Sequence, residues 1–144
     1  MTAGSVAIWR AGSGDAADVL AAAVFDGPAQ REWTVDFLAR RGHHLFLASI
    51  DEVVVGFVSG IEVAHPDKAV EMLLYELGVE EPFRRRGIGT ALVAALRDHA
   101  VALGCRGMWV PNDPASPTAI ATYRAAGANE LEAGVVLTWT FASP

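Results

Sequence analysis

The sequence has little of several features that mark specialised classes of protein. Cys105 is the only cysteine among the 144 residues, so an internal disulfide is excluded. No run of about 18 uncharged apolar residues occurs, which argues against a membrane span and a membrane partner. The first residues have neither the basic start nor the apolar core of a signal peptide. We therefore expect a cytoplasmic protein.

Positive charge is also scarce, because Lys68 is the only lysine and the formal net charge is −6. An acidic chain is repelled by the phosphates of DNA and RNA, so no nucleic-acid partner is expected. The four histidines are not spaced as metal ligands. His43 and His44, for example, are adjacent and point to opposite faces of a strand, whereas catalytic zinc needs three protein ligands. No metal is expected.

The chain is rich in patterned apolar segments instead. Hydrophobic residues make up 52% of it, enough for the core of a single domain over residues 1–144. Antiparallel strands come first and a βαβ unit follows. This order predicts an α/β (α+β) fold, with a mixed, mostly antiparallel central sheet of six to seven strands flanked by four helices. Strands are expected at residues 6–10, 44–48, 53–63, 70–79, 106–110 and 135–141, with a weak one near 129–131, and helices at 15–24, 30–41, 88–103 and 118–126.

A turn rich in arginine and glycine joins the expected strand at 70–79 to the long helix, with the sequence Arg84-Arg85-Arg86-Gly87-Ile88-Gly89-Thr90. The free N–H groups and the positive dipole end of a helix N-terminus bind anions. Glycine lets the backbone approach a phosphate closely, and arginine offers forked donors to its oxygens. The turn is therefore a candidate pyrophosphate site.

Other interpretations of this turn fit less well. A P-loop requires Gly-Lys followed by Ser or Thr, and the turn contains no lysine. A dinucleotide fingerprint requires Gly-x-Gly-x-x-Gly, whereas this chain has Leu92 at the last position. An ordinary helix start with solvated arginines remains the alternative.

Two motifs together give the sequence a resemblance to a known family. Arg84-x-x-Gly87-x-Gly89, after a strand that ends at Val79, resembles the acetyl-CoA motif of the GCN5-related N-acetyltransferase superfamily. The segment from Tyr123 to Gly127 is similar to the helix end that precedes the final strand in that family. Within the family, residues 71–79 look like the aminoglycoside 3-N-acetyltransferases of the gentamicin and fortimicin class.

The resemblance implies acetyl-CoA as the acetyl donor. In the family its pantetheine arm pairs with the main chain of the strand, and its pyrophosphate binds the amides that open the helix. Gly78 would permit a bulge or a close approach at this point of the strand, and a bulge would open the sheet for the thioester. Where the family often has asparagine this chain has Ser116, and Asn112 could replace it as a cofactor ligand. The predicted cofactor-binding residues are Leu77, Val79, Arg84, Arg85, Arg86, Gly87, Ile88, Gly89, Thr90 and Asn112.

The resemblance also implies direct attack of a neutral amine on the thioester, which needs a proton acceptor. We expect Glu76 to be the base or the anchor of the substrate ammonium, and Tyr123 to be the acid for the leaving thiolate. A solvent-facing carboxylate and a core-facing aromatic are the structural alternatives for these two residues. Tyr75 points to the opposite face from Glu76 if the strand is regular.

The acceptor is expected to bind beside the two early helices. Asp26, Glu32 and Asp36 could form an acidic rim with Glu76 that attracts a polyamine-like or aminoglycoside ligand, or they could be ordinary solvated residues. Tyr75 is a further predicted substrate-binding residue. The expected function is acetyl transfer to a primary amine of a small cationic acceptor. A protein N-terminal or lysine acetyltransferase and a non-catalytic acyl-CoA-binding module are the alternatives. Members of the family often form homodimers.

Overall fold

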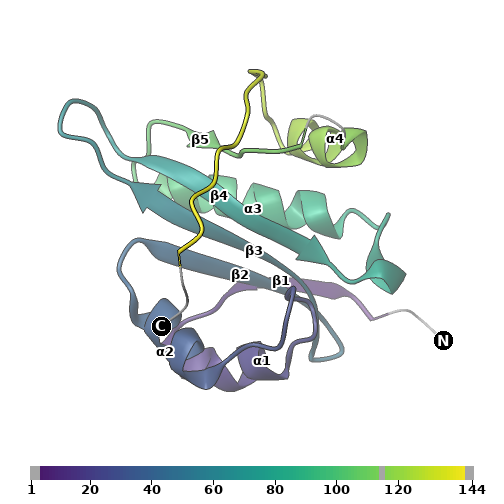
Figure 1. Cartoon of the computed structure of the whole chain (residues 1–144). Helices are drawn as coiled ribbons and strands as arrows, with labels where there is room; N and C mark the ends of the chain where they lie inside the picture. The colour runs from purple at the N-terminus through teal and green to yellow at the C-terminus, as the bar shows by residue number, and fades with distance from the viewer. Residues whose placement is uncertain (1–3, 114–115, 142–144) are drawn as a thin grey trace.

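The computed structural model describes residues 4–113 and 116–141, which are built around one central sheet (Figure 1). Strands β1 to β4 pair antiparallel in sequence order, and β5 pairs parallel with β4. Four helices flank this sheet, as the sequence predicts. The strands are β1 (Val6–Arg10), β2 (His43–Ile50), β3 (Val53–Val63), β4 (Glu71–Val79) and β5 (Met108–Trp109). The helices are α1 (Ala16–Ala21), α2 (Arg31–Ala39), α3 (Ile88–Ala102) and α4 (Pro117–Ala125), with short turns η1 (Ser13–Asp15) and η2 (Glu81–Phe83).

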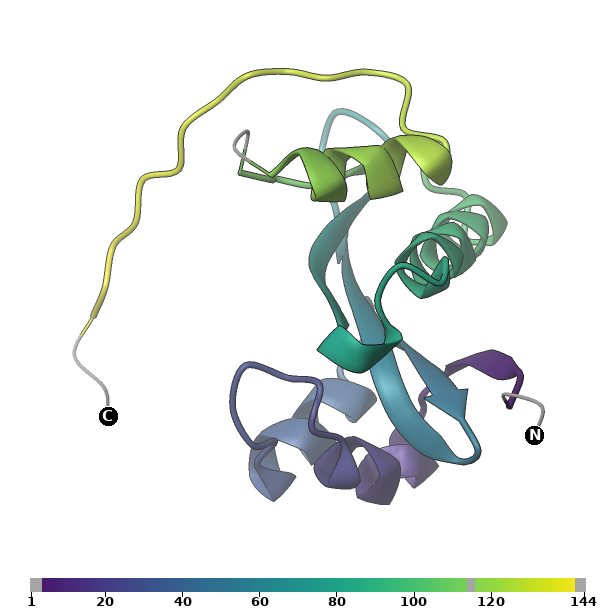
Figure 2. The ribbon, with the colours of Figure 1, turned by 90° about the vertical axis from the view of Figure 1, so that its right-hand side faces the viewer.

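The sheet separates two apolar layers. Helices α1 and α2 lie on one face and α3 lies on the other (Figure 2). Successive side chains of a strand point to opposite faces, so β2 contributes to both layers. Leu45 and Leu47 pack in the cluster beside α1 and α2, whereas Ala48 packs in the cluster beside α3. The strand therefore holds both helical layers in place.

Helix α3 is the main helix of the second layer because its apolar residues recur with helical spacing. Ile88, Leu92 and Leu96 are buried on the sheet, and burying such a side chain contributes about 1.5–3 kcal/mol. The helix ends at Ala102, and Gly104, just beyond its C-cap Leu103, has a φ of 83°. That left-handed conformation lets the Cys105 amide donate to the carbonyl of Ala100 at 3.0 Å.

Strand β4 departs from regular pairing at two places. Ser59 pairs with Glu76 and Gly60 with Leu74, so Tyr75 is an extra residue in a β-bulge. The bulge is thus not at Gly78, where we expected either a bulge or a close approach. Gly78 pairs regularly with Phe57, and a Cβ there would lie only 2.8 Å from that ring. Glycine is needed at this position for close packing rather than for a bulge.

The second departure is a separation of β4 from β5. The two strands pair only at Met72 with Met108 and at Leu73 with Trp109. Beyond Leu73, no strand of the described residues pairs with this edge of β4. The main chain of its second half is therefore open to an extended ligand.

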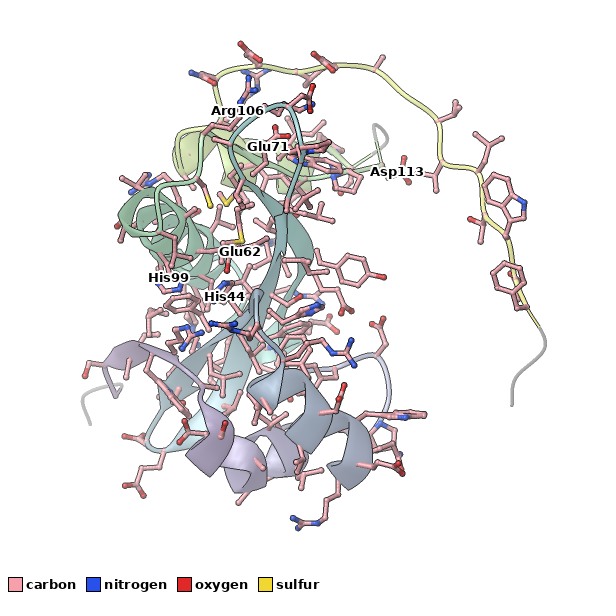
Figure 3. All side chains as sticks on the ribbon, turned by 90° about the vertical axis from the view of Figure 1, so that its left-hand side faces the viewer. His44, Glu62, Glu71, His99, Arg106 and Asp113 are labelled. Atoms are coloured by element: carbon pink, nitrogen blue, oxygen red, sulfur yellow. The ribbon has the colours of Figure 1, made fainter. Side chains whose placement is uncertain are left out.

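A buried polar cluster fills part of the space between the sheet and α3 (Figure 3). His44 is 5% exposed, and its Nε2 lies 2.8 Å from Oε2 of Glu62. Its Nδ1 lies 3.0 Å from Nη2 of Arg10 and 3.2 Å from Nε2 of His99. Because arginine only donates, Nδ1 of His44 is the acceptor and Nε2 is the donor to Glu62. The cluster thus ties α3 to three strands.

The expected strands beyond α4 are absent from the sheet, which has five strands in the described residues rather than six to seven. Residues 128–141 leave α4 and arch away from the body of the molecule (Figure 2). Val135 is 86% exposed and Phe141 is 81% exposed. The alternating pattern is present, but no neighbouring strand pairs with it in the part of the chain that the structure describes.

Candidate functional site

A groove of about 640 Å³ lies where the end of β4, the start of α3 and the start of α4 meet. It gathers most of the predicted cofactor-binding residues, because Leu77 and Val79 end β4 and the glycine-rich turn follows. Its lining residues are Leu77, Gly78, Val79, Phe83, Arg84, Arg85, Gly87, Ile88, Gly89, Thr90, Ser116, Thr118, Ala119 and Thr122.

The turn before α3 lines this groove. Gly87 is the residue before the helix and has a φ of 79°, and Arg85 has a φ of 63°. Among the described residues, no carbonyl accepts a backbone hydrogen bond from residues 85–88. Gly89 and Thr90 belong to the first helical turn, whose amides have no partner within the helix. These unpaired donors and the helix dipole suit a diphosphate.

The three arginines of the turn have different surroundings. The Nε of Arg84 donates to the carbonyl of Val79 at 2.8 Å, which fixes the guanidinium at the groove while its other donors remain available. Arg85 also lines the groove. The Arg86 guanidinium lies over the ring of Phe83 at 5.5 Å and is not among the lining residues. We therefore assign Arg86 a smaller part in anion binding than its neighbours.

The opposite wall of the groove is the first part of α4. Ser116 occupies the N-cap position of α4 and lines the groove. Asn112 does not line it. Its amide donates to the carbonyl of Asp113 at 3.1 Å, and its side chain faces a different groove next to β5. The structure thus brings Ser116, rather than Asn112, to the candidate cofactor site.

A second hollow, of about 350 Å³, lies on the opposite face of the sheet, between the segment that joins α1 to α2 and strands β3 and β4. Its walls are mostly aromatic and aliphatic, with Phe25, Trp33 and Phe37 among them. Asp26 and Glu76 are its only carboxylates in the described part of the chain. We call this hollow the acceptor pocket. An apolar pocket with a few converging polar groups is typical of a ligand site.

Electrostatics in the acceptor pocket favour proton exchange by Glu76. Partial burial, and then the nearby negative charge of Asp26, raise the pKa of Glu76 above its usual value. A carboxylate whose pKa is shifted toward neutral pH is a better proton acceptor. The hydroxyl of Ser59, which pairs with Glu76 across the strands, is buried and has no hydrogen-bond partner among the described residues. It is therefore available to a ligand.

The other residues of the predicted acidic rim lie outside this pocket. Asp36 forms an ion pair with Arg40 at 2.7 Å on the exposed side of α2, and Glu32 is exposed elsewhere on that helix. Tyr75, in the bulge, is 59% exposed and does not line the pocket. Sequence reasoning missed Ser59, Phe25 and Trp33 as pocket residues. Trp33, an aromatic residue on the expected helix at 30–41, was the one available signal.

Tyr123 lies on α4 but not in the cofactor groove. Its helix neighbour Thr122 lines that groove, whereas Tyr123 packs against the core and lines a smaller groove of about 200 Å³ next to β5. Burial raises the pKa of the Tyr123 phenol. The group therefore stays protonated at neutral pH and can donate a hydrogen bond.

Two other kinds of chemistry find no support in the structure. Among residues 4–113 and 116–141, no group of three or more His, Cys, Asp and Glu is arranged to hold a metal ion. Burial raises the pKa of the Cys105 thiol, which lowers the thiolate fraction that a nucleophile needs.

No helix of the described residues has the length and apolar content to cross a membrane.

Comparisons with known proteins are consistent with this geometry. The sequence model described as the acetyltransferase (GNAT) family matches residues 16–128. An aminoglycoside acetyltransferase, meta-AAC0020 from an uncultured soil metagenomic sample, solved with sisomicin, has a TM-score of 0.83 and 19% identity, over 95% of this chain and 97% of that chain. The aminoglycoside N-acetyltransferase AAC(6')-Iy, solved with CoA, has a TM-score of 0.75 and 20% identity, over 96% of this chain and 97% of that chain.

A protein-modifying enzyme has a similar structure. The ribosomal-protein-alanine N-acetyltransferase of Brucella melitensis biovar Abortus 2308 has a TM-score of 0.71 and 20% identity, over 93% of this chain and 100% of that chain. No curated protein matches the chain significantly. At these identities the structural likenesses concern the fold.

Proposed function

The chain belongs to the acetyltransferase (GNAT) family and is an acetyl-transferring enzyme, and we propose that its acceptor is a primary amine of a small cationic molecule of the aminoglycoside type. The donor in this proposal is acetyl-CoA, which supplies an activated thioester carbonyl. The observation that carries the choice of acceptor is the pair Asp26 and Glu76 in an otherwise apolar pocket. Two carboxylates in such surroundings attract an ammonium group strongly.

The cofactor groove supports the choice of donor. The unpaired amides of the turn and the Arg84 and Arg85 side chains face it, and together they match the charge and donor needs of a diphosphate. The open edge of β4 beyond Leu73 offers main-chain partners to an extended amide-containing arm. Leu77 lines this groove and Glu76, the residue before it, lines the acceptor pocket. The two sites therefore meet at β4.

Glu76 and Tyr123 carry the proton transfers in this proposal. The Glu76 carboxylate first holds the substrate ammonium and then accepts its proton, which frees the nitrogen lone pair for attack. As the C–S bond breaks, the Tyr123 hydroxyl donates to the sulfur. No covalent link to the protein is needed, in keeping with the raised pKa of Cys105. Ser59 is positioned to hydrogen-bond the acceptor.

The aromatic walls of the pocket favour a compact acceptor with apolar faces over a long polypeptide. Phe25, Trp33 and Phe37 can pack against the C–H faces of a sugar ring while Asp26 and Glu76 bind its ammonium groups. A protein N-terminus or lysine is the second candidate, because an N-acetyltransferase of ribosomal proteins has a similar structure. We further propose that the enzyme acts as a homodimer, because the C-terminal segment exposes many large apolar side chains.

A panel of amines tests the proposal when release of free CoA from acetyl-CoA is monitored. The panel holds gentamicin-like aminoglycosides, polyamines and peptides with a free N-terminus or lysine. We expect aminoglycosides to give the highest kcat/KM, and a preference for peptides would contradict the proposed acceptor. Tight CoA binding without turnover of any amine would instead indicate an acyl-CoA-binding module. Absence of CoA binding would contradict the assignment of the groove.

A further inference from the structure

Gly78 lies in β4 where the strand contacts both the cofactor groove and the layer of α1 and α2. It lines the groove, and a Cβ at this position would point into that layer. The Cβ would lie 2.8 Å from Cε1 of Phe57 and 3.4 Å from the carbonyl oxygen of Val24, and both residues belong to the apolar cluster beside α1 and α2. Carbon atoms in contact prefer a separation of about 3.5–4.0 Å. Only glycine therefore lets this layer rest directly on the main chain of β4.

The ring of Phe57 in turn supports the segment that joins α1 to α2. It lies 4.5 Å from the ring of Phe25, centre to centre, with the two planes tilted by 52°, a geometry that is favourable for aromatic pairs. Phe57 is buried, and a close-packed interior transmits a displacement from one side chain to the next. The position of Phe25 therefore depends on the contact between Phe57 and Gly78.

Side-chain packing is what holds this segment at the acceptor pocket. Residues 23–27 form no backbone hydrogen bond with any other residue that the structure describes. Asp26 follows Phe25 directly in the sequence and lines the pocket together with Glu76. The place of the Asp26 carboxylate is therefore set by where the Phe25 ring packs.

We infer that Gly78 and Phe57 are positioning residues, which set the place of Asp26 relative to Glu76. Gly78 and Glu76 are two residues apart on a regularly paired stretch of β4, so both face the layer of α1 and α2. The strand that carries Glu76 thus also supports the segment that brings Asp26. The inference rests on the proposed function, in which Glu76 accepts the proton of the amine, and it gives the contact between Gly78 and Phe57 a part in that step.

Displacing the Phe57 ring from β4 should change the proton affinity of Glu76. Asp26 and Glu76 are the titratable residues that line the pocket in the described chain, and α2 and β3 contribute only uncharged residues to it. Partial burial and the charge of Asp26 raise the pKa of Glu76. Both causes weaken when the segment moves away, so the pKa of Glu76 should fall.

Gly78→Ala tests the inference, with Gly60→Ala as a matched control. A Cβ at Gly60 would lie 2.7 Å from Cδ1 of Leu96, so it overpacks the other face of the sheet to a similar degree. Both variants should have a lower melting temperature. The pKa of Glu76 is followed by NMR of its carboxyl carbon in the full chain without ligands, and the pH profile of kcat/KM is recorded with the best amine of the panel.

We expect Gly78→Ala to lower the pKa of Glu76, to move the acidic limb of the rate profile to lower pH, and to reduce kcat/KM by up to about 10²-fold, as a small misplacement of reacting groups can. Gly60→Ala should leave the pKa and the limb in place. Equal shifts in the two variants, or no shift in Gly78→Ala, would overturn the inference. A wild type that acetylates no amine would contradict the proposed function instead, and the NMR titration would still decide the positioning role.

A double-mutant cycle with Phe57→Leu examines the same contact without adding volume. Phe57→Leu removes the ring that joins Gly78 to Phe25, so it should also lower the pKa of Glu76. The double variant should show no larger shift than Phe57→Leu alone, because the alanine then has no ring to displace. Shifts that add would show that the two residues act separately, which would contradict the inference even if Gly78→Ala alone fails to fold.

Discussion

The cofactor groove and the acceptor pocket meet at β4 but are built from different parts of the polypeptide. The groove presents mainly backbone: amides of residues 85–90, left-handed Gly87 and the open edge of β4. The pocket presents side chains, above all Asp26 and Glu76 in aromatic surroundings. A backbone site tolerates changes of side chain but not of conformation, and a side-chain site shows the reverse. Substitutions should therefore separate binding of the donor from turnover of the acceptor.

The largest expected effect is that of Glu76→Gln on turnover. The amide keeps the size of the side chain but cannot accept the amine proton, so kcat should fall about 10²–10⁴-fold. Affinity for CoA, measured by calorimetry, should not change. The melting temperature should stay equal or rise slightly, because burial disfavours the charged form of Glu76. Full turnover by this variant would remove Glu76 from the mechanism.

Tyr123→Phe tests the proposed acid on the other side of the reaction. Loss of one hydrogen-bond donor to developing charge costs about 10²-fold in kcat, and we expect that order of effect at saturating donor and acceptor. The test is strict because Tyr123 does not line the cofactor groove and instead lines the smaller groove next to β5. Acyl donors with a better leaving group sharpen it further: a thioester whose thiol is more acidic should lose less rate in the variant than acetyl-CoA does.

Gly87→Ala tests the backbone site, where we expect weaker donor binding with little change in turnover. Gly87 has a φ of 79° and no atom lies within 4 Å of a Cβ placed there, so the alanine meets no clash and only the backbone conformation is strained. A left-handed conformation costs an L-residue about 1–2 kcal/mol, which corresponds to about a tenfold weaker affinity for CoA if the turn relaxes. kcat at saturating acetyl-CoA should change little. Arg86→Ala, which leaves the conformation alone, is the control and should weaken CoA binding less.

A smaller effect is expected at Asp26, through the pH dependence of the reaction. Glu76 acts when ionised, so kcat/KM should rise with pH as its carboxyl loses a proton. The negative charge of Asp26 helps to raise the pKa of Glu76. Asp26→Asn should therefore lower that pKa and move the acidic limb of the rate profile to lower pH. Asp36→Asn, which removes the partner of Arg40 outside the pocket, should leave the limb in place.

The smallest effect is expected in the polar cluster, which belongs to neither region. Burial, and then the electrostatic influence of His44 and Arg10, lower the pKa of His99 from its usual 6.5. The unfolded chain then takes up a proton first, so stability falls as the pH drops below about 6.5. His99→Gln should make the melting temperature less dependent on pH between 8 and 5.5. The corresponding change in the free energy of unfolding should be under about 1 kcal/mol, as for other partly exposed charges. An unchanged slope would exclude His99 as its source.

The regions differ equally in how far the sequence predicts them. The phosphate-binding turn is local: a strand, Gly87, Gly89 and a helical apolar pattern lie within one stretch of chain, so short-range hydrogen bonding determines its shape. The acceptor pocket joins the segment before α2 to β3 and β4, and no spacing rule brings Phe25 and Ser59 together. For this reason, Asp26 is the only other residue of the predicted acidic rim that lies with Glu76 in the pocket.

The errors in the sheet have a similar cause. The bulge is at Tyr75 and not at Gly78, because pairing between β3 and β4 decides where a residue is left over. The expected last strand from Val135 to Phe141 has the alternation of a strand but no pairing in the described chain. Alternation shows that one face of a segment requires burial, and it does not show which surface provides it.

The separation of β4 and β5 beyond Leu73 has a thermodynamic consequence. It leaves an unfinished ladder of main-chain donors and acceptors inside the fold. A ligand that completes this ladder binds the native chain and not the unfolded one, so its binding free energy adds to that of folding. The resistance of the protein to heat and proteolysis in a cell would then follow the local supply of its acyl donor.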